Sequence, residues 1–197
     1  FRGHSDTEVM LAAFEEWGVA GALERFIGMF AIALWDRRER RLTLARDRLG
    51  KKPLYYGWAG ETFLCGSELK TLRAHSDFAP PIDRDALALY LRHGYIPAPY
   101  TIYEGVYKLL PGSLLTLNAP TDRPVPTAYW SMRDAVEHGL ADPLRLSDSE
   151  LIDELDSLLR DAVGLRMIAD VPLGAFLSGG IDSSTVVALM QAQSARP

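Results

Sequence analysis

The chain has 197 residues, 48% of them hydrophobic, so it is long enough for one domain or two partial ones with apolar cores. Its formal net charge of −5 and its pI near 5.4 argue against nucleic-acid binding, which needs clustered Lys and Arg. The single cysteine, Cys65, excludes an internal disulfide and favours a cytoplasmic location, and no apolar run is long enough to span a membrane.

The chain is expected to begin with a helix. Ser5 and Glu8 have the spacing of a capping box, in which the serine caps the helix and the glutamate reaches back to it. Apolar residues recur at helical spacing after this box, and Gly18 is expected to end the helix.

A sheet-rich region follows. The nearly continuous apolar run 26–35 predicts a strand that is buried on both faces. Its hairpin partner is expected at 40–45, and two further strands are expected at 53–58 and 62–65, joined by a turn at Gly60. Antiparallel pairing therefore dominates the first part of the chain.

The next helix is expected to start at Asp83, which can cap it, and to end at Gly94. The prolines within 96–100 require an extended backbone there. The segment 110–117 predicts a turn followed by a strand. A polar, proline-containing stretch then begins, and we expect residues 119–146 to form a connector.

A second structural unit is expected after the connector. Ser147 and Glu150 form another capping box, which opens an amphipathic helix. The apolar run 171–177 predicts a strand that passes through a glycine–serine turn into a helix at 185–190. The order helix, strand, loop, helix is typical of the start of a nucleotide-binding α/β unit.

The turn between this strand and helix has the composition of a phosphate-binding loop. Gly179 and Gly180 lack a Cβ atom, so the backbone can approach a ligand closely. The N–H groups at the start of a helix attract phosphate oxygens. Three serines and an aspartate add hydroxyl donors and a candidate Mg²⁺ ligand: Ser178, Ser183, Ser184 and Asp182.

The alternative interpretation of this loop is an ordinary strand-to-helix turn, with Asp182 as a first-turn carboxylate. Crowding of the polar side chains around the two glycines favours phosphate binding instead. The Lys of a Walker A loop is missing, so the loop is of another type.

Four segments of the first region are similar to the amino-terminal-nucleophile glutaminase domain of glutamine-hydrolysing asparagine synthetases: Gly3–Glu8, Gly28–Asp36, Arg46–Tyr56 and Gly66–Lys70. The run Ser178–Ser184 resembles the pyrophosphate loop in the synthetase domain of the same family. The resemblance implies a partial α+β N-terminal-nucleophile hydrolase sandwich, followed by the start of an α/β, Rossmann-like ATP pyrophosphatase domain. Residues 1–118 would be the C-terminal part of the class II glutaminase domain, 119–146 the connector and 147–197 the start of the ATP-binding domain.

The resemblance also implies an activity for a longer protein. In the family, ammonia released from glutamine travels through an internal tunnel to a site where ATP adenylates aspartate. Pyrophosphate is released, and ammonia then attacks the β-aspartyl-AMP to give asparagine and AMP. ATP and Mg²⁺ are the implied cofactors, and glutamine, aspartate and ATP the implied substrates. Neither nucleic acid nor a membrane is expected as a partner, and a homodimer stays open.

The resemblance assigns Asp6 to the α-ammonium group of glutamine; its alternative role is a first-turn carboxylate. It assigns ATP and pyrophosphate to nine consecutive residues: Phe176, Leu177, Ser178, Gly179, Gly180, Ile181, Asp182, Ser183 and Ser184. Phe176 and Leu177 would meet the adenosine, with core packing as the alternative. Met29 aligns with a residue that borders the family's tunnel, but we expect it in the core.

The family's nucleophile is an amino-terminal cysteine, whereas this chain begins with Phe1, so no catalytic residue is expected within it. Cys65 is expected to be a buried apolar residue. Arg46 and Asp47 are expected to form a structural ion pair that fixes the following turn, and Ser67 to cap a short helix. The chain is thus expected to be an internal piece of a longer protein and inactive by itself.

Two alternatives to asparagine synthesis stay open. One keeps the two-domain plan and changes the carboxylate acceptor, as in β-lactam synthetases or amidotransferases that modify peptides or glycans. The other is a non-catalytic relative that retains the scaffold, although the three serines and the aspartate of the loop argue against it.

Overall fold

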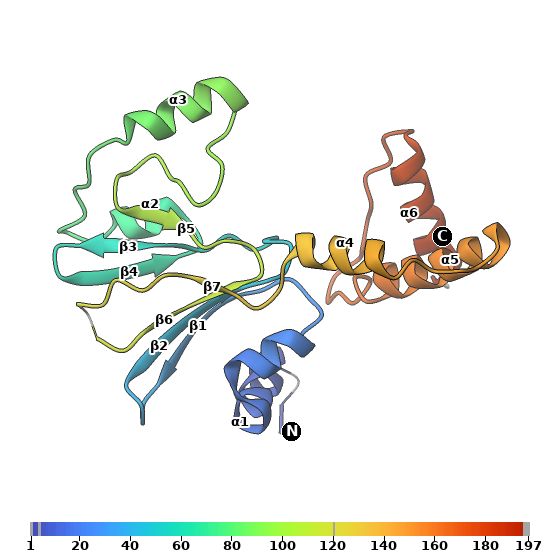
Figure 1. Cartoon of the computed structure of the whole chain (residues 1–197), viewed down its shortest axis with the longest axis horizontal. Helices are drawn as coiled ribbons and strands as arrows, with labels where there is room; N and C mark the ends of the chain where they lie inside the picture. Colours follow the sequence, from blue (N-terminus) through green and yellow to red (C-terminus); the bar gives the residue numbers. More distant parts are fainter. Residues whose placement is uncertain (1, 4, 120, 195–197) are drawn as a thin grey trace. The chain divides into compact units, whose positions relative to one another are not determined.

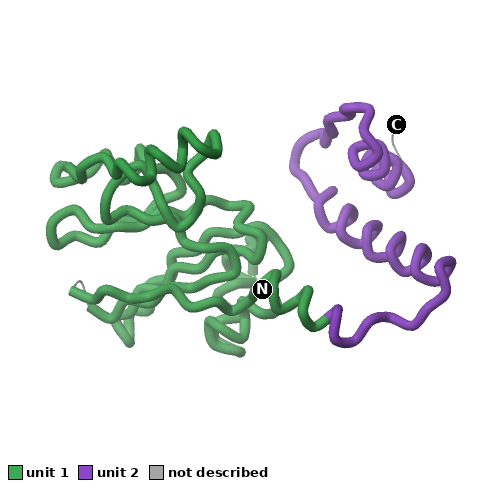
Figure 2. The backbone as a smooth tube through the Cα atoms, turned by 45° about the horizontal axis from the view of Figure 1, so that its top comes forward, with its two compact units in different colours: residues 1–138 green, residues 139–197 purple. Residues whose placement is uncertain are grey.

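The computed structural model describes residues 2–3, 5–119 and 121–194, so His4, within the first similar segment, lies outside the described residues. The chain divides into two compact units, Phe1–His138 and Gly139–Pro197 (Figure 2). The elements of the first unit are α1 (Asp6–Arg25), β1 (Ala31–Asp36), β2 (Arg41–Arg46), β3 (Tyr55–Ala59), β4 (Thr62–Gly66), α2 (Leu69–Arg73), α3 (Arg84–His93), β5 (Val106–Lys108), β6 (Ser113–Leu117) and β7 (Thr127–Ala128). Helix α4 (Met132–Ala141) crosses the division, and the second unit contains α5 (Asp148–Gly164) and α6 (Ile181–Ala192).

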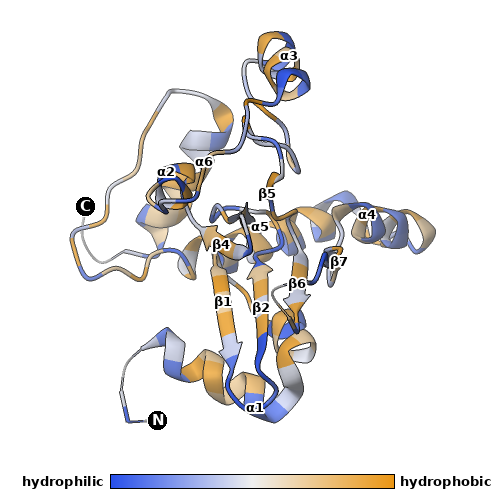
Figure 3. Ribbon diagram, turned by 90° about the vertical axis from the view of Figure 1, so that its left-hand side faces the viewer, coloured by the Kyte–Doolittle hydropathy of each residue, from blue (hydrophilic) through white to orange (hydrophobic). Residues whose placement is uncertain are grey.

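Two antiparallel sheets form the body of the first unit (Figure 1). One has the strand order β1-β2-β6-β7 and the other the order β4-β3-β5. The two sheets pack face to face as two layers, because buried side chains from both of them form one core cluster. The cluster consists of Leu44, Leu54, Tyr56, Leu109, Leu115 and Leu117. Figure 3 shows that β1 and β2 are hydrophobic along much of their length. Of their residues, Leu44 belongs to the cluster, and Ala31 and Leu42 pack against it. The predicted α+β class and the two hairpins, β1–β2 and β3–β4, are confirmed.

The start of α1 confirms one half of the predicted capping box. Ser5 Oγ accepts a hydrogen bond of 3.2 Å from Thr7 N. The carboxylate of Glu8, however, accepts from the N–H groups of Arg2 and Gly3, at 2.7 and 2.8 Å, rather than from Ser5. The prediction for Glu8 was therefore wrong: its carboxylate fixes the residues before the cap.

Gly18 does not end this helix. It has φ 68° and ψ 169°, which kinks the backbone, and helical geometry then resumes as far as Arg25. Glycine tolerates such angles because it has no Cβ atom. The Arg25 guanidinium lies 4.9 Å from the centre of the Trp17 ring, a contact that bridges the kink.

The apolar run 26–35 is a strand only from Ala31 onward, and that strand is not buried on both faces. Phe26 and Phe30 instead belong to an aromatic stack with Phe14, with ring centres 5.7 and 5.8 Å apart. Within β1, inward and outward side chains alternate, and Trp35 is 53% exposed. Among the described residues β1 pairs with β2 alone, which makes it an edge strand.

Later elements of the first unit agree more closely with the sequence. Asp83 caps α3 through the N–H groups of Asp85 and Ala86, each at 2.9 Å, and Gly94 ends it in a left-handed conformation. The segment 96–100 lies outside the helices and strands, and β6 follows the turn at 111–112 as expected. The predicted cap of α2 was wrong, because Glu68 rather than Ser67 precedes its first residue.

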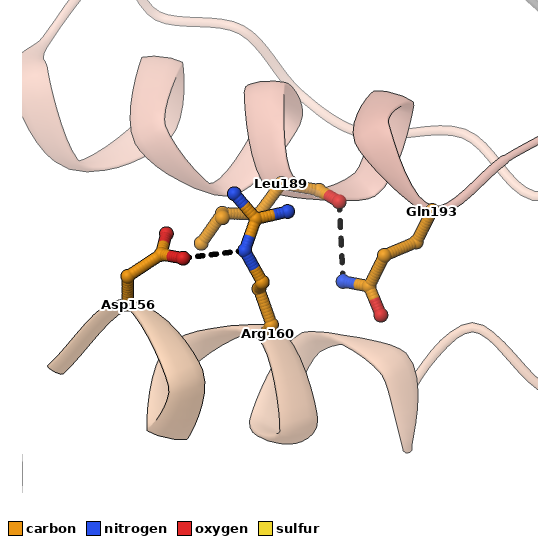
Figure 4. A network of polar contacts seen from close by, with 4 residues as sticks. All are labelled: Asp156, Arg160, Leu189 and Gln193. Carbon is orange, nitrogen blue, oxygen red and sulfur yellow. Dashed lines mark hydrogen bonds and ion pairs between the residues drawn. The ribbon is translucent and has the colours of Figure 1, made fainter. Parts of the chain in front are cut away.

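The second unit has a confirmed capping box and a missing strand. Ser147 and Glu150 exchange the two hydrogen bonds of the box at the start of α5. Figure 4 shows polar contacts on its helices: the Arg160 Nε–Asp156 ion pair of 2.5 Å in α5, and the bond from Gln193 Nε2 to the Leu189 carbonyl at the C-terminal end of α6. The run 171–177 is not a strand, because no described segment pairs with it, and α6 begins at Ile181 rather than at 185.

Candidate functional site

The loop before α6 has the backbone and hydroxyl geometry of a tight turn into a helix. Gly179 has φ +80°, a left-handed conformation that favours glycine, and Gly180 is the residue that precedes the helix. The hydroxyls of Ser178 and Ser183 lie 2.9 Å apart, and Ser183 Oγ also donates to the Gly180 carbonyl at 3.1 Å. These bonds close the loop on itself.

The donors of the loop face solvent. Within the described part of the chain, no acceptor receives a hydrogen bond from the backbone N–H groups of Gly179, Gly180, Ile181 or Asp182. The side chains of the loop are exposed, except for half-buried Ser183. Free N–H groups at a helix start, with the dipole of a 12-residue helix behind them, suit an anion such as phosphate.

The apolar residues around the loop do not pack in a core. Phe176 and Leu177 are exposed, and so is Ile181 in the first turn of α6. Core packing, the alternative considered for Phe176 and Leu177, therefore does not occur in the described structure. Their side chains remain accessible to a ligand.

Asp182 could contribute to a metal site but could not form one alone. Its carboxylate is exposed in the first turn of α6, beside the unpartnered N–H groups. No group of three or more His, Cys, Asp or Glu suited to a metal ion occurs among the described residues. A single carboxylate beside a candidate phosphate site suits Mg²⁺, which is commonly bound by one or two carboxylates together with substrate phosphates and water.

Asp6 lies at the first position of α1, in the other unit. Its Oδ1 accepts hydrogen bonds from Thr7 N at 2.7 Å and from the Thr7 hydroxyl at 3.4 Å, and the side chain is exposed. The neighbouring carboxylate of Glu8 is engaged by two backbone N–H groups, Arg2 first and Gly3 second, which lower its pKa. Both Glu8 oxygens accept a hydrogen bond, whereas Asp6 Oδ2 accepts none from the described residues and is therefore free to bind a ligand.

Arg46 and Asp47 form a structural site, but not with each other. The Arg46 guanidinium donates to the carbonyls of Lys52, Leu109 and Gly50 at 2.7, 2.6 and 2.6 Å. The buried Asp47 carboxylate accepts from three backbone N–H groups: Phe30 at 3.3 Å, Lys51 at 2.9 Å and Lys52 at 2.9 Å. The predicted ion pair was therefore wrong, while the predicted structural role of the turn is confirmed.

Tyr129 is a member of this network that sequence reasoning missed. Its hydroxyl donates to the Arg46 carbonyl at 2.8 Å, across 83 positions of the chain. Burial, with a smaller contribution from the nearby Asp47 charge, raises the pKa of Tyr129 to about 12. No local sequence pattern points to a hydrogen bond between residues so far apart in the chain.

Cys65 and Met29 differ in how well they follow expectation. Cys65 packs against the core cluster from β4 and is half-buried, and this burial raises the pKa of its thiol. The reactive thiolate is thereby disfavoured, in agreement with a packing role. Met29 is 51% exposed, so its predicted position in the core was wrong.

The comparisons with known proteins cover both units. Residues 1–130 match the model of the glutamine amidotransferase domain. The chain belongs to this family. Residues 154–197 match the model described as asparagine synthase, which includes the loop before α6. The two matches follow each other on one chain in the order that the two structural units have.

The curated relatives of this chain are considerably longer than the chain itself. A putative glutamine-hydrolysing asparagine synthetase 2 of Methanocaldococcus jannaschii is 39% identical over 95% of this chain and 35% of its own length. The glutamine-hydrolysing asparagine synthetase 3 of Bacillus subtilis is 36% identical over 95% of this chain and 30% of its own length. Amidase chry2 of Gibberella zeae is 34% identical over 96% of this chain and 27% of its own length. The chain thus spans about a third of the length of these relatives.

Proposed function

We propose that the chain is part of a glutamine-hydrolysing asparagine synthetase. The observation that carries this proposal is the succession, on one chain, of a glutamine amidotransferase match and an asparagine synthase match. The second match includes a loop with free N–H donors. Two relatives that are similar to this chain over 95% of its length bear the name asparagine synthetase.

The proposed reaction divides between the units. The first would belong to a glutaminase domain of the N-terminal-nucleophile class, with Asp6 holding the α-ammonium group of glutamine and residues 1–118 as its C-terminal part. The second, residues 147–197, would begin an ATP pyrophosphatase domain after a connector at 119–146. There, ATP would adenylate aspartate, and ammonia from glutamine would displace AMP.

Residues of the loop would hold the phosphates. The N–H groups of Gly179 and Gly180 and the hydroxyls of Ser178, Ser183 and Ser184 would donate to phosphate oxygens, and Phe176 and Leu177 would border the adenosine. Asp182 would hold Mg²⁺, which neutralises phosphate charge when it is bound. The single cysteine supports a cytoplasmic location for the protein.

Unprotonated ammonia is needed for attack on the acyl group, and water competes with it. Transfer inside the protein serves both needs, because it keeps the nucleophile away from solvent protons. A carboxylate is a poor electrophile until it carries AMP as a leaving group. The proposed use of ATP at the second site supplies that leaving group.

The change Asp182→Ala in the full-length enzyme tests the loop assignment. We expect pyrophosphate release to fall by about 100-fold or more, since charge stabilisation of the phosphates is lost, while glutamine hydrolysis persists. Asp148→Ala, which removes a first-turn carboxylate from α5 instead, is the matched control and should leave both activities in place. Unchanged pyrophosphate release in Asp182→Ala would contradict the assignment.

A second candidate function keeps this architecture with another carboxylate acceptor. The similarity to Amidase chry2 over 96% of the chain favours it, because a relative with a different name shares both units. AMP formation by the full-length enzyme that requires aspartate supports asparagine synthesis. AMP formation with a different carboxylate supports the second candidate, and none with any acceptor supports a non-catalytic relative.

A further inference from the structure

The chain leaves the first unit through a short segment that is held firmly. After β7, the N–H groups of Tyr129 and Trp130 both donate to the Gly112 carbonyl, at 2.8 and 3.2 Å. The backbones approach closely here, since a Cβ atom at Gly112 would lie only 2.4 Å from the Trp130 carbonyl oxygen. The Tyr129 hydroxyl adds its bond to Arg46. Helix α4 then carries the chain across the division between the units.

Asp47 is the centre to which this exit segment is tied. Its carbonyl accepts from Gly112 N at 3.0 Å and from Gly50 N at 2.9 Å. Its own N–H donates to the Phe30 carbonyl at 3.0 Å, and its carboxylate accepts from Phe30 N. One residue, 1% exposed, thus joins the entry to β1, the turn after β2 and the exit segment.

A carboxylate is specifically suited to this position. Three N–H donors, from Phe30, Lys51 and Lys52, converge on its two oxygens. An ionised carboxylate accepts at both oxygens, whereas an amide of the same shape accepts at one and presents donors at the other. Asparagine would therefore set an N–H group against at least one of these donors while conserving volume.

We propose that Asp47 is a positioning residue for nitrogen transfer: it fixes the exit segment of the amidotransferase unit and thereby couples glutamine hydrolysis to amide formation in the second unit. The inference rests on the proposed function. Asp47 touches no substrate in this scheme. Its carboxylate holds the N–H groups of Phe30, Lys51 and Lys52, and these bonds fix the Asp47 carbonyl that accepts from Gly112 N. Loss of the carboxylate would loosen this carbonyl and with it the exit segment, so that hydrolysis proceeds while ammonia escapes to solvent.

The experiment compares Asp47→Asn with the wild type in the full-length enzyme. The measured quantity is the number of glutamates formed per amide product, with glutamine as the nitrogen source. We expect this ratio to rise by about threefold, within the range that remote changes to coupling produce. Amide formation from added ammonium chloride should stay close to wild type, because it needs no transfer between the units.

Asp36→Asn is the matched control. The Asp36 carboxylate also accepts from two backbone N–H groups, Arg38 and Glu39, but it lies in the exposed turn at the other end of β1. Its ratio should equal that of the wild type. Should Asp47→Asn not fold, Tyr129→Phe provides the second variant, and its ratio should rise in the same direction.

The outcomes separate the two proposals. A purely structural role for Asp47 predicts lower stability and a parallel fall in both activities with the ratio unchanged, and that result overturns the inference alone. If Asp47→Asn does not fold, an unchanged ratio in a folded Tyr129→Phe variant likewise overturns the inference alone. A wild-type enzyme that hydrolyses glutamine but forms no amide with any acceptor overturns the proposed function, and the inference with it.

Discussion

At the residue scale, the side chains of Arg46 and Asp47 illustrate how side-chain hydrogen bonds can replace those of regular secondary structure. The turn from Asp47 to Leu54 belongs to no helix or strand, so its backbone groups need other partners. The Arg46 guanidinium serves three carbonyls and the Asp47 carboxylate three N–H groups. Burial lowers the pKa of Arg46, and burial together with the nearby Arg46 charge lowers the pKa of Lys108.

Tyr129 gives a prediction about pH. Its hydroxyl donates to a backbone carbonyl, so Tyr129→Phe should lower the free energy of unfolding by about 1 kcal/mol at pH 8. Above pH 10 an unfolded tyrosine loses its proton, whereas folded Tyr129 keeps it until about pH 12. The native state then binds more protons than the unfolded state, so this contribution to stability is lost between pH 10 and pH 12.

The measurement is urea denaturation of both proteins, followed by tryptophan fluorescence from pH 8 to pH 12. The difference between wild type and variant should shrink as the pH rises through this window. Tyr90→Phe, which removes an exposed hydroxyl from α3, controls for the loss of a phenol group as such. A difference that stays constant to pH 12 would contradict the raised pKa of Tyr129.

At the element scale, the capping box of α5 should stabilise the second unit. Ser147→Ala removes the cap acceptor for Glu150 N and the hydroxyl that donates to the Glu150 carboxylate, and we expect a loss of about 1 kcal/mol. Hydrogen exchange of the amides in the first two turns of α5 measures this effect directly. In Ser157→Ala, at an exposed mid-helix position, the protection of these amides should equal or slightly exceed that in the wild type.

The elements that the sequence predicted correctly are those whose signals are local. The caps Asp83 and Ser147 and the hairpin turn at Gly60 depend on a few neighbouring residues. The phosphate-binding assignment of the loop also rests on seven consecutive residues. It stays a prediction, and the free N–H groups of the loop meet one of its requirements. Local composition was sufficient for the two caps and the turn.

Errors arose where a partner elsewhere in the chain decides the outcome. Apolar composition alone predicted a strand at 171–177, but a strand needs a neighbour for its backbone groups, and no described segment provides one. Residues 26–30 were expected to belong to a strand because they continue the apolar run 26–35. Phe26 instead stacks on Phe14, and Phe30 stacks on Phe26. Tyr129 could not be predicted because its acceptor lies 83 residues away.

At the scale of the whole molecule, the two units differ in how much apolar surface they bury. The first contains the core cluster between its two sheets, with Leu44, Leu109 and Leu115 inaccessible to solvent. In the second, Leu189, which is 7% exposed, is the one buried hydrophobic residue among those described. Apolar side chains of its long helix are instead exposed: Leu151, Ile152, Leu155, Leu158 and Leu159. No helix among the described residues is long and apolar enough to cross a membrane.

This difference predicts two levels of stability within the chain. Apolar burial contributes roughly 25 cal/mol per Å², so a unit with one buried hydrophobic residue gains little to offset its conformational entropy. In hydrogen exchange of this 197-residue chain, amides of α5 and α6 should have protection factors about 100-fold lower than those of β2 and β6. Equal protection in both units would contradict this, because it would require the exposed leucines of α5 to be covered. In the full-length protein we expect the protection of α5 and α6 to rise toward that of the sheets, since the rest of the synthetase domain would cover these side chains.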